Sequence, residues 1–311
     1  MEFKHVPIML DECLQGLNIK SNGIYFDGTL GGAGHSSEIL KRLNGGLLIA
    51  TDKDDDALNV STKRLSAIGN NFVTVKADFK DFNRVLDDLK IDKIDGVLLD
   101  LGVSSYQLDN AERGFSYTKD APLDMRMDQT NTLTAFDVVN TYTESQLAKI
   151  FYEYGEEPFT KNIVKNILEE RKIKPIKTTL ELAQIIKNSV PKKVQIAKGN
   201  PCKRVFQAIR IEVNRELTGL EQAIYEMIAR LKKGGRIAII TFHSLEDRIV
   251  KDAFKLCATD CICPKSIPIC VCGHKASIKL INKKPLVAND REQRENSRSL
   301  SAKLRIAEKI I

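Results

Sequence analysis

The sequence lacks features that would place it in several large classes of protein. No apolar run approaches the roughly 20 residues of a membrane-spanning helix, and no internal repeat is found along the 311 residues. The first residues, M-E-F-K-H-V-P, have neither the basic start nor the apolar stretch of a signal peptide. We therefore expect a cytoplasmic protein without a membrane partner. The composition, 42% hydrophobic and 29% charged, suits one large or two ordinary globular domains.

Cysteine is present, but not in a pattern that favours disulfides. In a cytosolic chain, the seven cysteines point to thiols or metal ligands. Cys261-x-Cys263 and Cys270-x-Cys272-Gly273-His274 lie within 14 residues. Four thiols so close suggest a structural, tetrahedral Zn²⁺ site that closes a loop with little apolar content. C-x-C spacing is less typical of zinc than C-x-x-C, so free thiols remain an equal alternative.

Positive charge is concentrated in two segments of a chain whose net charge is +7. From Lys275 to the end, ten Lys or Arg face four Asp or Glu, a net charge of +6. The other segment runs from 192 to 210, contains no acid and carries six basic residues: Lys192, Lys193, Lys198, Lys203, Arg204 and Arg210. Two such segments favour a polyanion as the partner, most simply a nucleic acid, over the alternative of a solvated surface.

The stretch from Tyr25 to Ser37, Y-F-D-G-T-L-G-G-A-G-H-S-S, is the most informative in the chain. It follows an expected strand at residues 24–26 and precedes helical apolar spacing over residues 36–43. Strand, glycine-rich turn and helix form the layout of a nucleotide-binding crevice, and a tight structural turn is the alternative. Glycine lets a ligand press on bare backbone, and the helix start offers free N–H groups. The four glycines are Gly28, Gly31, Gly32 and Gly34.

The next expected strand, at 47–50, leads to Asp52, which lies about 20 positions past the glycines and suits a ribose hydroxyl pair. Two cofactors fit this spacing. NAD needs a binding site for its pyrophosphate, usually the motif G-x-G-x-x-G, but the nearest match has Ser37 in place of the last glycine. The acidic Asp27 would repel a pyrophosphate and tolerate a cationic methionine moiety. The charge therefore favours S-adenosylmethionine, with NAD as the alternative.

Alternating elements along the first 100 residues predict an α/β fold with a parallel, doubly wound sheet. Further strands are expected at 72–75 and 94–99, with helices at 54–67 and 82–89. Ligands bind such sheets at the carboxyl ends of the strands. Four strand ends are polar there, at Asp27, Asp52, Asp78-Phe79 and Asp100.

The alternation stops at about residue 109, and no strand is expected before residue 204. Capping-box patterns at Thr143-x-x-Gln146 and Thr178-x-x-Glu181 predict two helices, and residues 159–168 predict another. One long helix is then expected over 209–231, a strand over 236–242, a loop over 243–247 and an irregular basic tail. We therefore predict a core of residues 1–108 and 205–311, interrupted by an inserted helical domain, 109–204, that recognises the substrate.

Several motifs together resemble the ribosomal RNA small-subunit methyltransferase H family. They are D-G-T-L-G-G-A-G-H-S-S, D-L-G-V-S-S-Y-Q-L-D, E-R-G-F-S, L-D-M-R-M-D, R-V-F-Q-A-I-R-I-E-V-N, F-H-S-L-E-D-R-I-V-K and S-A-K-L-R. The resemblance implies a class I (Rossmann-like) S-adenosylmethionine-dependent methyltransferase sheet with an inserted small helical domain. It also implies methylation of the N4 amine of a decoding-centre cytidine in 16S rRNA, with the small ribosomal subunit as partner. The sequence contains no pattern that predicts the oligomeric state.

The chain departs from the family pattern at a few positions. Ala33 stands where the family usually has glycine, and Tyr106 replaces a usual proline. Cys202-Lys203 replaces P-A-T or P-A-K, and the tail reads N-S-R-S-L-S where N-P-R-A-R-S is usual. The last change removes the second arginine of the tail motif.

The resemblance also implies the cofactor-binding residues. Asp52 would take the ribose and Phe79 would stack on adenine, although a core aromatic is an equal reading of Phe79. Asp100 and Gln107 would complete the pocket. The methionine end would be held by Gly32, Ala33, Gly34 and His35.

Methylating a cytosine amine requires positioning, acceptors for its N–H groups and a route for one proton. Asp100, in the turn after the fourth strand, and His243 are the catalytic candidates, although the turn lacks a D-P-P-Y motif and a structural role for His243 is equally expected. Aromatic residues usually receive a flipped base, and Tyr106, Phe115 and Phe242 are candidates. The remaining substrate candidates are Ser104 and Ser105, together with Arg113 and Arg126 for phosphates.

Overall fold

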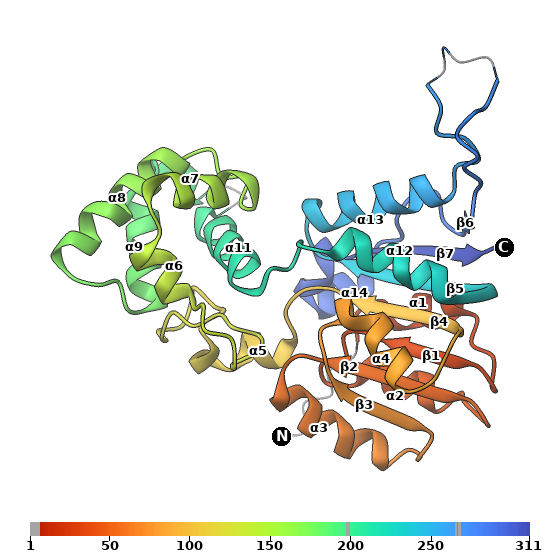
Figure 1. Cartoon of the computed structure of the whole chain (residues 1–311). Coiled ribbons are helices and arrows are strands. Elements are labelled where there is room, and N and C mark those ends of the chain that lie inside the picture. Colours follow the sequence, from red (N-terminus) through yellow and green to blue (C-terminus); the bar gives the residue numbers. More distant parts are fainter. Residues whose placement is uncertain (1–6, 197–199, 265, 267–268) are drawn as a thin grey trace. The chain divides into compact units, whose positions relative to one another are not determined.

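The computed structural model describes residues 7–196, 200–264, 266 and 269–311. The chain forms two compact units, a core of Met1–Gly102 with Leu217–Ile311 and an insertion of Val103–Glu216 (Figure 1). An insertion was predicted, but its boundaries, 109 and 204, were wrong. The insertion extends past residue 204 because helix α11 (Pro201–Asn214) contacts α6 (Ala135–Thr141), α7 (Glu144–Glu153) and α9 (Thr179–Asn188).

Within the described residues, the core contains one seven-stranded sheet in the order β3-β2-β1-β4-β5-β7-β6. The strands β1 to β5 pair in parallel, as predicted. From β1 the chain steps outward to β3 and then returns to β4 on the other side of β1. The strand order therefore reverses between β1 and β4, where doubly wound sheets bind ligands. The strands are β1 (Ile24–Asp27), β2 (Leu47–Asp52), β3 (Phe72–Lys76), β4 (Ile94–Asp100), β5 (Leu231–Thr241), β6 (Ile278–Leu280) and β7 (Lys303–Lys309).

Helices cover both faces of this sheet, so its central strands are apolar on both sides. On β5, Ile237 and Ile239 pack into one apolar cluster, whereas Ala238 and Ile240 pack into the other. The first cluster includes α4 (Phe82–Asp88), α12 (Leu220–Arg230) and α13 (Ser244–Cys257). The second includes α1 (Leu10–Leu17), α2 (Gly34–Leu40) and α3 (Asp55–Ser66). Shorter elements are η1 (Phe79–Asp81), α14 (Asp290–Glu295) and η3 (Ser297–Ser301).

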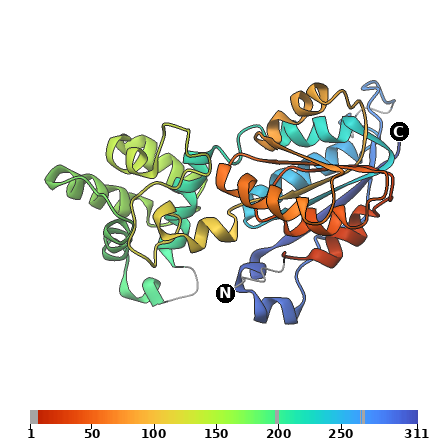
Figure 2. The same cartoon turned by 90° about the horizontal axis from the view of Figure 1, so that it is seen from below.

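The insertion is helical and has its own apolar core (Figure 2, yellow to green). Both predicted capping boxes are confirmed, since Thr143 caps α7 through Gln146 and Thr178 caps α9 through Glu181. In its described residues the insertion has no strand, only the isolated bridge between Pro122 and Thr178. Besides α11, its elements are α5 (Ser105–Asp109), η2 (Ala111–Arg113), α6 (Ala135–Thr141), α7 (Glu144–Glu153), α8 (Thr160–Ile173), α9 (Thr179–Asn188) and α10 (Lys192–Ile196).

The single long helix expected over 209–231 is wrong. It is two helices, because Arg215 takes a left-handed conformation with φ 50° and ends α11. Gly219, with φ 77°, then precedes α12. Apolar residues keep helical spacing across this break, so periodicity alone did not reveal it.

The loop expected over 243–247 and the irregular tail are also corrected. His243 is the N-cap of α13, so residues 244–247 are helical. The tail contains β7, which pairs antiparallel with β5 and with β6. Its charged residues Lys303 and Arg305 are compatible with a strand because both bond to Asp247 on α13, at 3.2 and 2.7 Å. In the described ranges, no helix has both the length and the apolar character that crossing a bilayer requires.

Candidate functional site

The carboxyl ends of β1 and β4 meet at the point where the strand order reverses. Gly28, the first residue after β1, donates its N–H to the carbonyl of Leu98 on β4 at 3.0 Å. Thr29 links the acidic ends of the two strands. Its N–H donates to Asp27 Oδ1 at 3.0 Å, and its Oγ1 accepts the N–H of Asp100 at 2.6 Å. Asp27 and Asp100 therefore lie on one rim, as their positions in the sequence predicted.

Side chains on β2 and α3 form hydrogen bonds with the backbone of the glycine-rich loop between β1 and α2. Gly31, with φ 47°, donates its N–H to Asp52 Oδ2 at 2.8 Å. The carbonyls of Gly31 and Gly32 accept Ser61 Oγ at 2.5 Å and Arg64 Nη1 at 2.8 Å. These bonds bring Asp52 beside the loop and fix the loop backbone.

Ala33 shows why glycine is usual at its position in the family. It is buried and has a left-handed φ of 56°, a conformation that glycine adopts without strain. It is also the N-cap of α2, so the loop delivers the chain directly into a helix start. The backbone geometry that the glycines predicted is therefore present although one glycine is replaced.

Gly32 and Gly34 offer a matched test of whether a ligand lies on this loop. A Cβ built at Gly32 meets nothing within 4 Å, whereas one at Gly34 would lie 2.5 Å from Pro7 Cγ. We expect Gly32→Ala to keep the parent's melting temperature and to bind S-adenosylmethionine a few-fold to about tenfold more weakly, because the added methyl group would push a ligand away from the loop backbone and weaken about one hydrogen bond to it. Gly34→Ala should instead lower the melting temperature. Calorimetry and thermal unfolding measure both, and unchanged affinity in Gly32→Ala would mean that no ligand contacts the loop there.

The acidic rim is electrostatically unbalanced. Burial raises the pKa of Asp27 to about 6, despite hydrogen bonds from Ser36 and Thr29. Burial, followed by repulsion from Asp27 and Glu246, raises the pKa of Asp100 to about 8. Asp100 Oδ1 has no hydrogen-bond partner among the described residues. A group of this kind is stabilised by a positive charge placed beside it.

The pKa values of two further groups are also raised. Burial raises the pKa of Asp52, although the N–H groups of Asp54 and Gly31 bond to it. Burial, and then repulsion from Asp100, raises the pKa of the Cys13 thiol well above its usual range. The rim therefore disfavours added negative charge, in line with the expectation that a pyrophosphate does not bind here.

His35 lies at this rim, as predicted. It is buried on the first turn of α2, with Nδ1 at 3.6 Å from Asp100 Oδ2 and Nε2 at 3.0 Å from the carbonyl of Ile8. Phe79 also lies next to the glycine-rich loop. A Cβ built on Gly28 would be only 2.7 Å from Phe79 Cβ. Phe79 is half-buried, and Lys80 Nζ lies over its ring at 5.6 Å from the centroid.

Gln107 belongs to the insertion, and there its amide has a local structural role. Gln107 Oε1 accepts the N–H of Ser104 at 3.0 Å, while Ser104 Oγ accepts the N–H of Gln107 at 3.2 Å, a capping box at the start of α5. Ser105 is the first residue of α5, and Tyr106 follows with half of its surface exposed. The cofactor role of Gln107 and the substrate roles of Ser104, Ser105 and Tyr106 remain predictions.

The two arginines predicted to hold phosphates have other partners. Arg113 is buried and donates through Nη2 to the carbonyls of Arg126 and Met127. Arg126 donates through Nε and Nη2 to Asp124 at 3.0 and 2.7 Å, and through Nη1 to two carbonyls. These bonds shape the L-D-M-R-M-D loop, so the geometry argues against phosphate contacts by either side chain.

His243, a catalytic candidate, is also held by local contacts. Its Nδ1 accepts the N–H of Glu246 at 3.4 Å, and its Nε2 lies 3.0 Å from Glu246 Oε1. Both side chains are buried. A helix-capping role accounts for these contacts. Of the aromatic candidates, Phe115 is buried in the insertion core and Phe242 is partly buried in the core unit.

Sequence reasoning missed two hydroxyls that organise the rim. Besides Thr29, Ser36 on α2 donates from Oγ to Asp27 Oδ2 at 2.7 Å. Both flank the glycines, and that position is the signal that was available, since Ser and Thr commonly bond to nearby carboxylates and backbone groups.

The reversed strand order, the antiparallel β7, the glycine-rich loop and the acidic strand ends define a class I S-adenosylmethionine-dependent methyltransferase. The chain belongs to the MraW methylase family, whose sequence pattern matches residues 2–310. It is 53% identical to the ribosomal RNA small subunit methyltransferase H of Finegoldia magna, over 100% of both chains. It is 55% identical to the protein of that name from Lachnospira eligens, over 100% of this chain and 99% of that one. The resemblance is thereby confirmed, and NAD is no longer a competing cofactor.

Proposed function

We propose that this methyltransferase modifies the N4 amine of a decoding-centre cytidine in the 16S rRNA of the small ribosomal subunit. The names of its relatives support ribosomal RNA as the substrate. The observation that carries the chemistry is Asp100, a carboxyl at the switch point of the sheet, one oxygen of which has no hydrogen-bond partner in the part of the chain that the structure describes. It lies beside His35 and Thr29 of the glycine-rich loop.

The rim residues fit S-adenosylmethionine, which supplies a methyl group on a positively charged sulfur. Asp52 would accept the ribose hydroxyls, because a carboxylate has about four acceptor positions and, within the described residues, it accepts two bonds, from the N–H groups of Gly31 and Asp54. Phe79 would stack on the adenine. The N–H groups around Gly32, Ala33, Gly34 and His35 would face the methionine end, near the charges of Asp27 and Asp100.

Asp100 is the residue best placed to act on the target amine. The lone pair of a cytosine N4 amine is delocalised into the ring, so the nitrogen must pyramidalise before it can attack. A carboxylate that accepts one of its N–H bonds favours that geometry and can receive the proton released on transfer. Asp100 Oδ1, which no described residue hydrogen-bonds, offers this acceptor, while Thr29 holds the backbone of Asp100 in place.

The charge available for RNA phosphates is smaller than the sequence suggested. In the segment 192–210, Arg210 forms a two-bond pair with Glu216 at 2.8 Å, and Arg204 lies 3.5 Å from Glu157. In the tail, Lys303 and Arg305 pair with Asp247 and Lys279 pairs with Glu308. The exposed cations that remain for RNA in the first segment are Lys192, Lys193 and Lys203, whereas Lys198 lies outside the described residues.

Lys192 and Lys193 should therefore contribute to RNA affinity in a salt-dependent way. We expect Lys192→Ala with Lys193→Ala to weaken binding to small subunits and to reduce the log–log salt slope by roughly 1.4–1.8, because each lost phosphate contact accounts for roughly 0.7–0.9. Affinity for S-adenosylmethionine should not change. Filter binding across a series of salt concentrations measures the slope.

The insertion also offers a control with the same change in net charge. Lys165 and Lys174 lie on or next to α8 and pair with Glu169 and Glu181. Lys165→Ala with Lys174→Ala should leave the salt slope at the parent value. An equal loss of slope in both double variants would show that only total charge matters.

The proposed reaction is tested with small ribosomal subunits from a strain that lacks this methylation. Incubation with labelled S-adenosylmethionine should place label in 16S rRNA, and nucleoside analysis should find it as N4-methylcytidine. Label at another atom or in another RNA would refute the assigned substrate. Tight binding without label would instead support an RNA-binding assembly factor that holds the cofactor only as a ligand.

A further inference from the structure

Between α13 and β6, the described residues 258–264, 266 and 269–277 lie away from the sheet of the core as a long loop (Figure 1). We call it the cysteine loop. Its ends are fastened: the N–H of Ser277 donates to the carbonyl of Cys257 at 2.8 Å, and the N–H of Ala276 donates to Asp260 Oδ1 at 3.3 Å. The methyltransferase rim does not include any part of this loop, so what holds it folded is a separate question.

The cysteine loop has little apolar burial of its own. Among its described residues, the large apolar side chains Ile262, Ile269 and Val271 are exposed by 52%, 75% and 75%. A segment that cannot bury apolar surface does not repay the conformational entropy lost on ordering. Small elements of this kind are commonly held by a disulfide or a metal ion instead.

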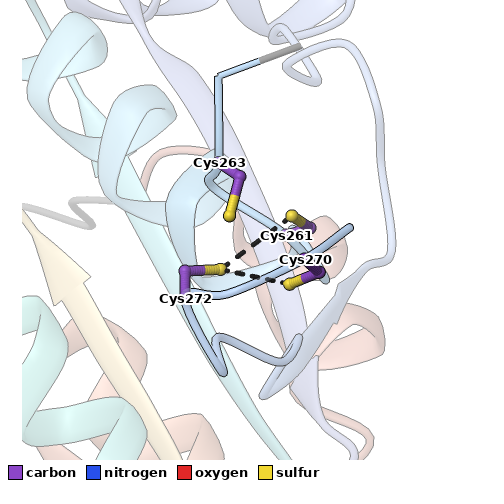
Figure 3. A group of neighbouring side chains, drawn as sticks. All are labelled: Cys261, Cys263, Cys270 and Cys272. Carbon is purple, nitrogen blue, oxygen red and sulfur yellow. Dashed lines mark hydrogen bonds between the residues drawn. The ribbon is translucent and has the colours of Figure 1, made fainter. Parts of the chain in front are cut away.

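Four cysteine sulfurs converge inside the loop (Figure 3). All four Sγ atoms, of Cys261, Cys263, Cys270 and Cys272, lie within 4.8 Å of one another. Cys272 Sγ is 3.5 Å from Cys270 Sγ and 3.9 Å from Cys261 Sγ. A tetrahedral ion with metal–sulfur bonds of about 2.3 Å places its ligand sulfurs about 3.8 Å apart. The distances of 3.5 and 3.9 Å from Cys272 Sγ bracket that value, and the other sulfur separations do not exceed 4.8 Å.

We propose that these four cysteines bind one structural Zn²⁺ ion. Four thiolates are soft ligands that in tetrahedral array select zinc or iron, and zinc requires no redox partner. On binding, each thiol loses its proton to solvent and its sulfur donates an electron pair to the ion, so no oxidation occurs. With four protein ligands the coordination sphere is closed, and the ion fixes the loop rather than taking part in methyl transfer.

The backbone and the neighbouring histidine support a site made of sulfur alone. The N–H of Val271 points at Cys263 Sγ at 3.5 Å, a contact that stabilises a thiolate. His274, although next to the second cysteine pair, has its Nε2 at 3.0 Å from the carbonyl of Leu256 on α13. That contact directs the His274 ring to the helix, so the four sulfurs complete the site.

The test uses the full chain, purified under reducing conditions. Elemental analysis should find about one zinc per chain, and Cys261→Ser with Cys263→Ser should abolish it. Cys257→Ser is the matched control, because Cys257 lies four positions before the first ligand and outside the cluster. It should keep its zinc. Co²⁺ added to the metal-free protein should produce the visible absorption of a tetrahedral thiolate site, and Zn²⁺ should displace it.

A protease-protection measurement on the parent protein tests the zinc proposal if the double variant does not fold. Metal-free parent protein should be cleaved by protease within residues 258–277, and added Zn²⁺ should protect it, while the rest of the chain is unaffected. The proposal is overturned if reduced metal-free protein fails to bind Zn²⁺ or Co²⁺ in titration. It is equally overturned if the purified protein holds iron, or if mass analysis shows that the cysteines form two disulfides in the reduced cytosol-like buffer.

Discussion

Asp100→Asn is expected to slow methyl transfer by about 10²–10⁴-fold, the range for losing a group that handles a proton in the transition state. It should also remove the pH dependence of cofactor binding above pH 6. In the free protein, burial and the nearby charges of Asp27 and Glu246 raise the pKa of Asp100 to about 8. A bound cation favours the carboxylate, so binding releases a proton and tightens, by up to about tenfold per pH unit, as pH rises toward 8. Calorimetry in buffers of different ionisation enthalpy measures that proton.

The same substitution predicts a change in stability with a definite sign. The folded-state pKa of Asp100, about 8, lies above the ordinary value of 3.8. Its contribution to stability is therefore fully present below 3.8 and is lost as pH rises through 8. Asp100→Asn should be more stable than the parent at pH 9 while being less active. A variant with the parent's rate and proton release would exclude Asp100 from the reaction.

Asp95 provides the control on the same strand. It lies at the opposite end of β4, where it accepts bonds from Lys20, Lys232 and the N–H of Ile24. Asp95→Asn should lower the melting temperature, because it removes the charge from these bonds. It should leave the affinity for S-adenosylmethionine and its pH dependence unchanged.

Asp52→Ala is expected to weaken S-adenosylmethionine binding about ten- to a hundredfold, since a hydrogen bond to a charged group is worth about 1.5–3 kcal/mol. The variant should also melt at a lower temperature, because the N–H groups of Gly31 and Asp54 lose their acceptor. Calorimetry with an unchanged dissociation constant would remove Asp52 from the site.

Two further variants separate loss of the ligand contact from loss of the loop. Asp52→Asn keeps a side-chain oxygen for the N–H of Gly31, so its stability should approach the parent's while its affinity stays low. Asp55→Ala removes an exposed carboxylate three positions away that pairs with Lys76. It should change neither quantity. Equal losses of affinity for Asp52→Ala and Asp55→Ala would indicate a general effect of charge.

Much of the core could be predicted from the sequence because its signals are local. The strands β1, β2 and β4 are short apolar runs that each end in an aspartate. The strand β7 could not be predicted in this way. Its Lys303 and Arg305 share the carboxylate of Asp247, 56 and 58 positions away, and no local pattern contains that partner.

The candidate site was predictable to the extent that it depends on topology. Parallel strands bring their carboxyl ends to one edge, so Asp27, Asp52 and Asp100 could be grouped before their contacts were known. No comparable rule predicts from the sequence in which direction a side chain points. Arg113 was assigned to phosphate because of its charge, whereas it points inward to two backbone carbonyls.

The insertion also has a consequence for synthesis of the chain on the ribosome. In the finished protein, β4 lies between β1 and β5. While the nascent chain ends within the insertion, β5 does not yet exist, and one side of β4 is an unpaired edge. That strand is buried from Ile94 to Leu99 and is apolar there apart from Asp95. Exposed edges of this kind pair readily with other chains. The interval needed to translate residues 103–216 is thus a period of heightened aggregation risk, which ends only when β5 emerges.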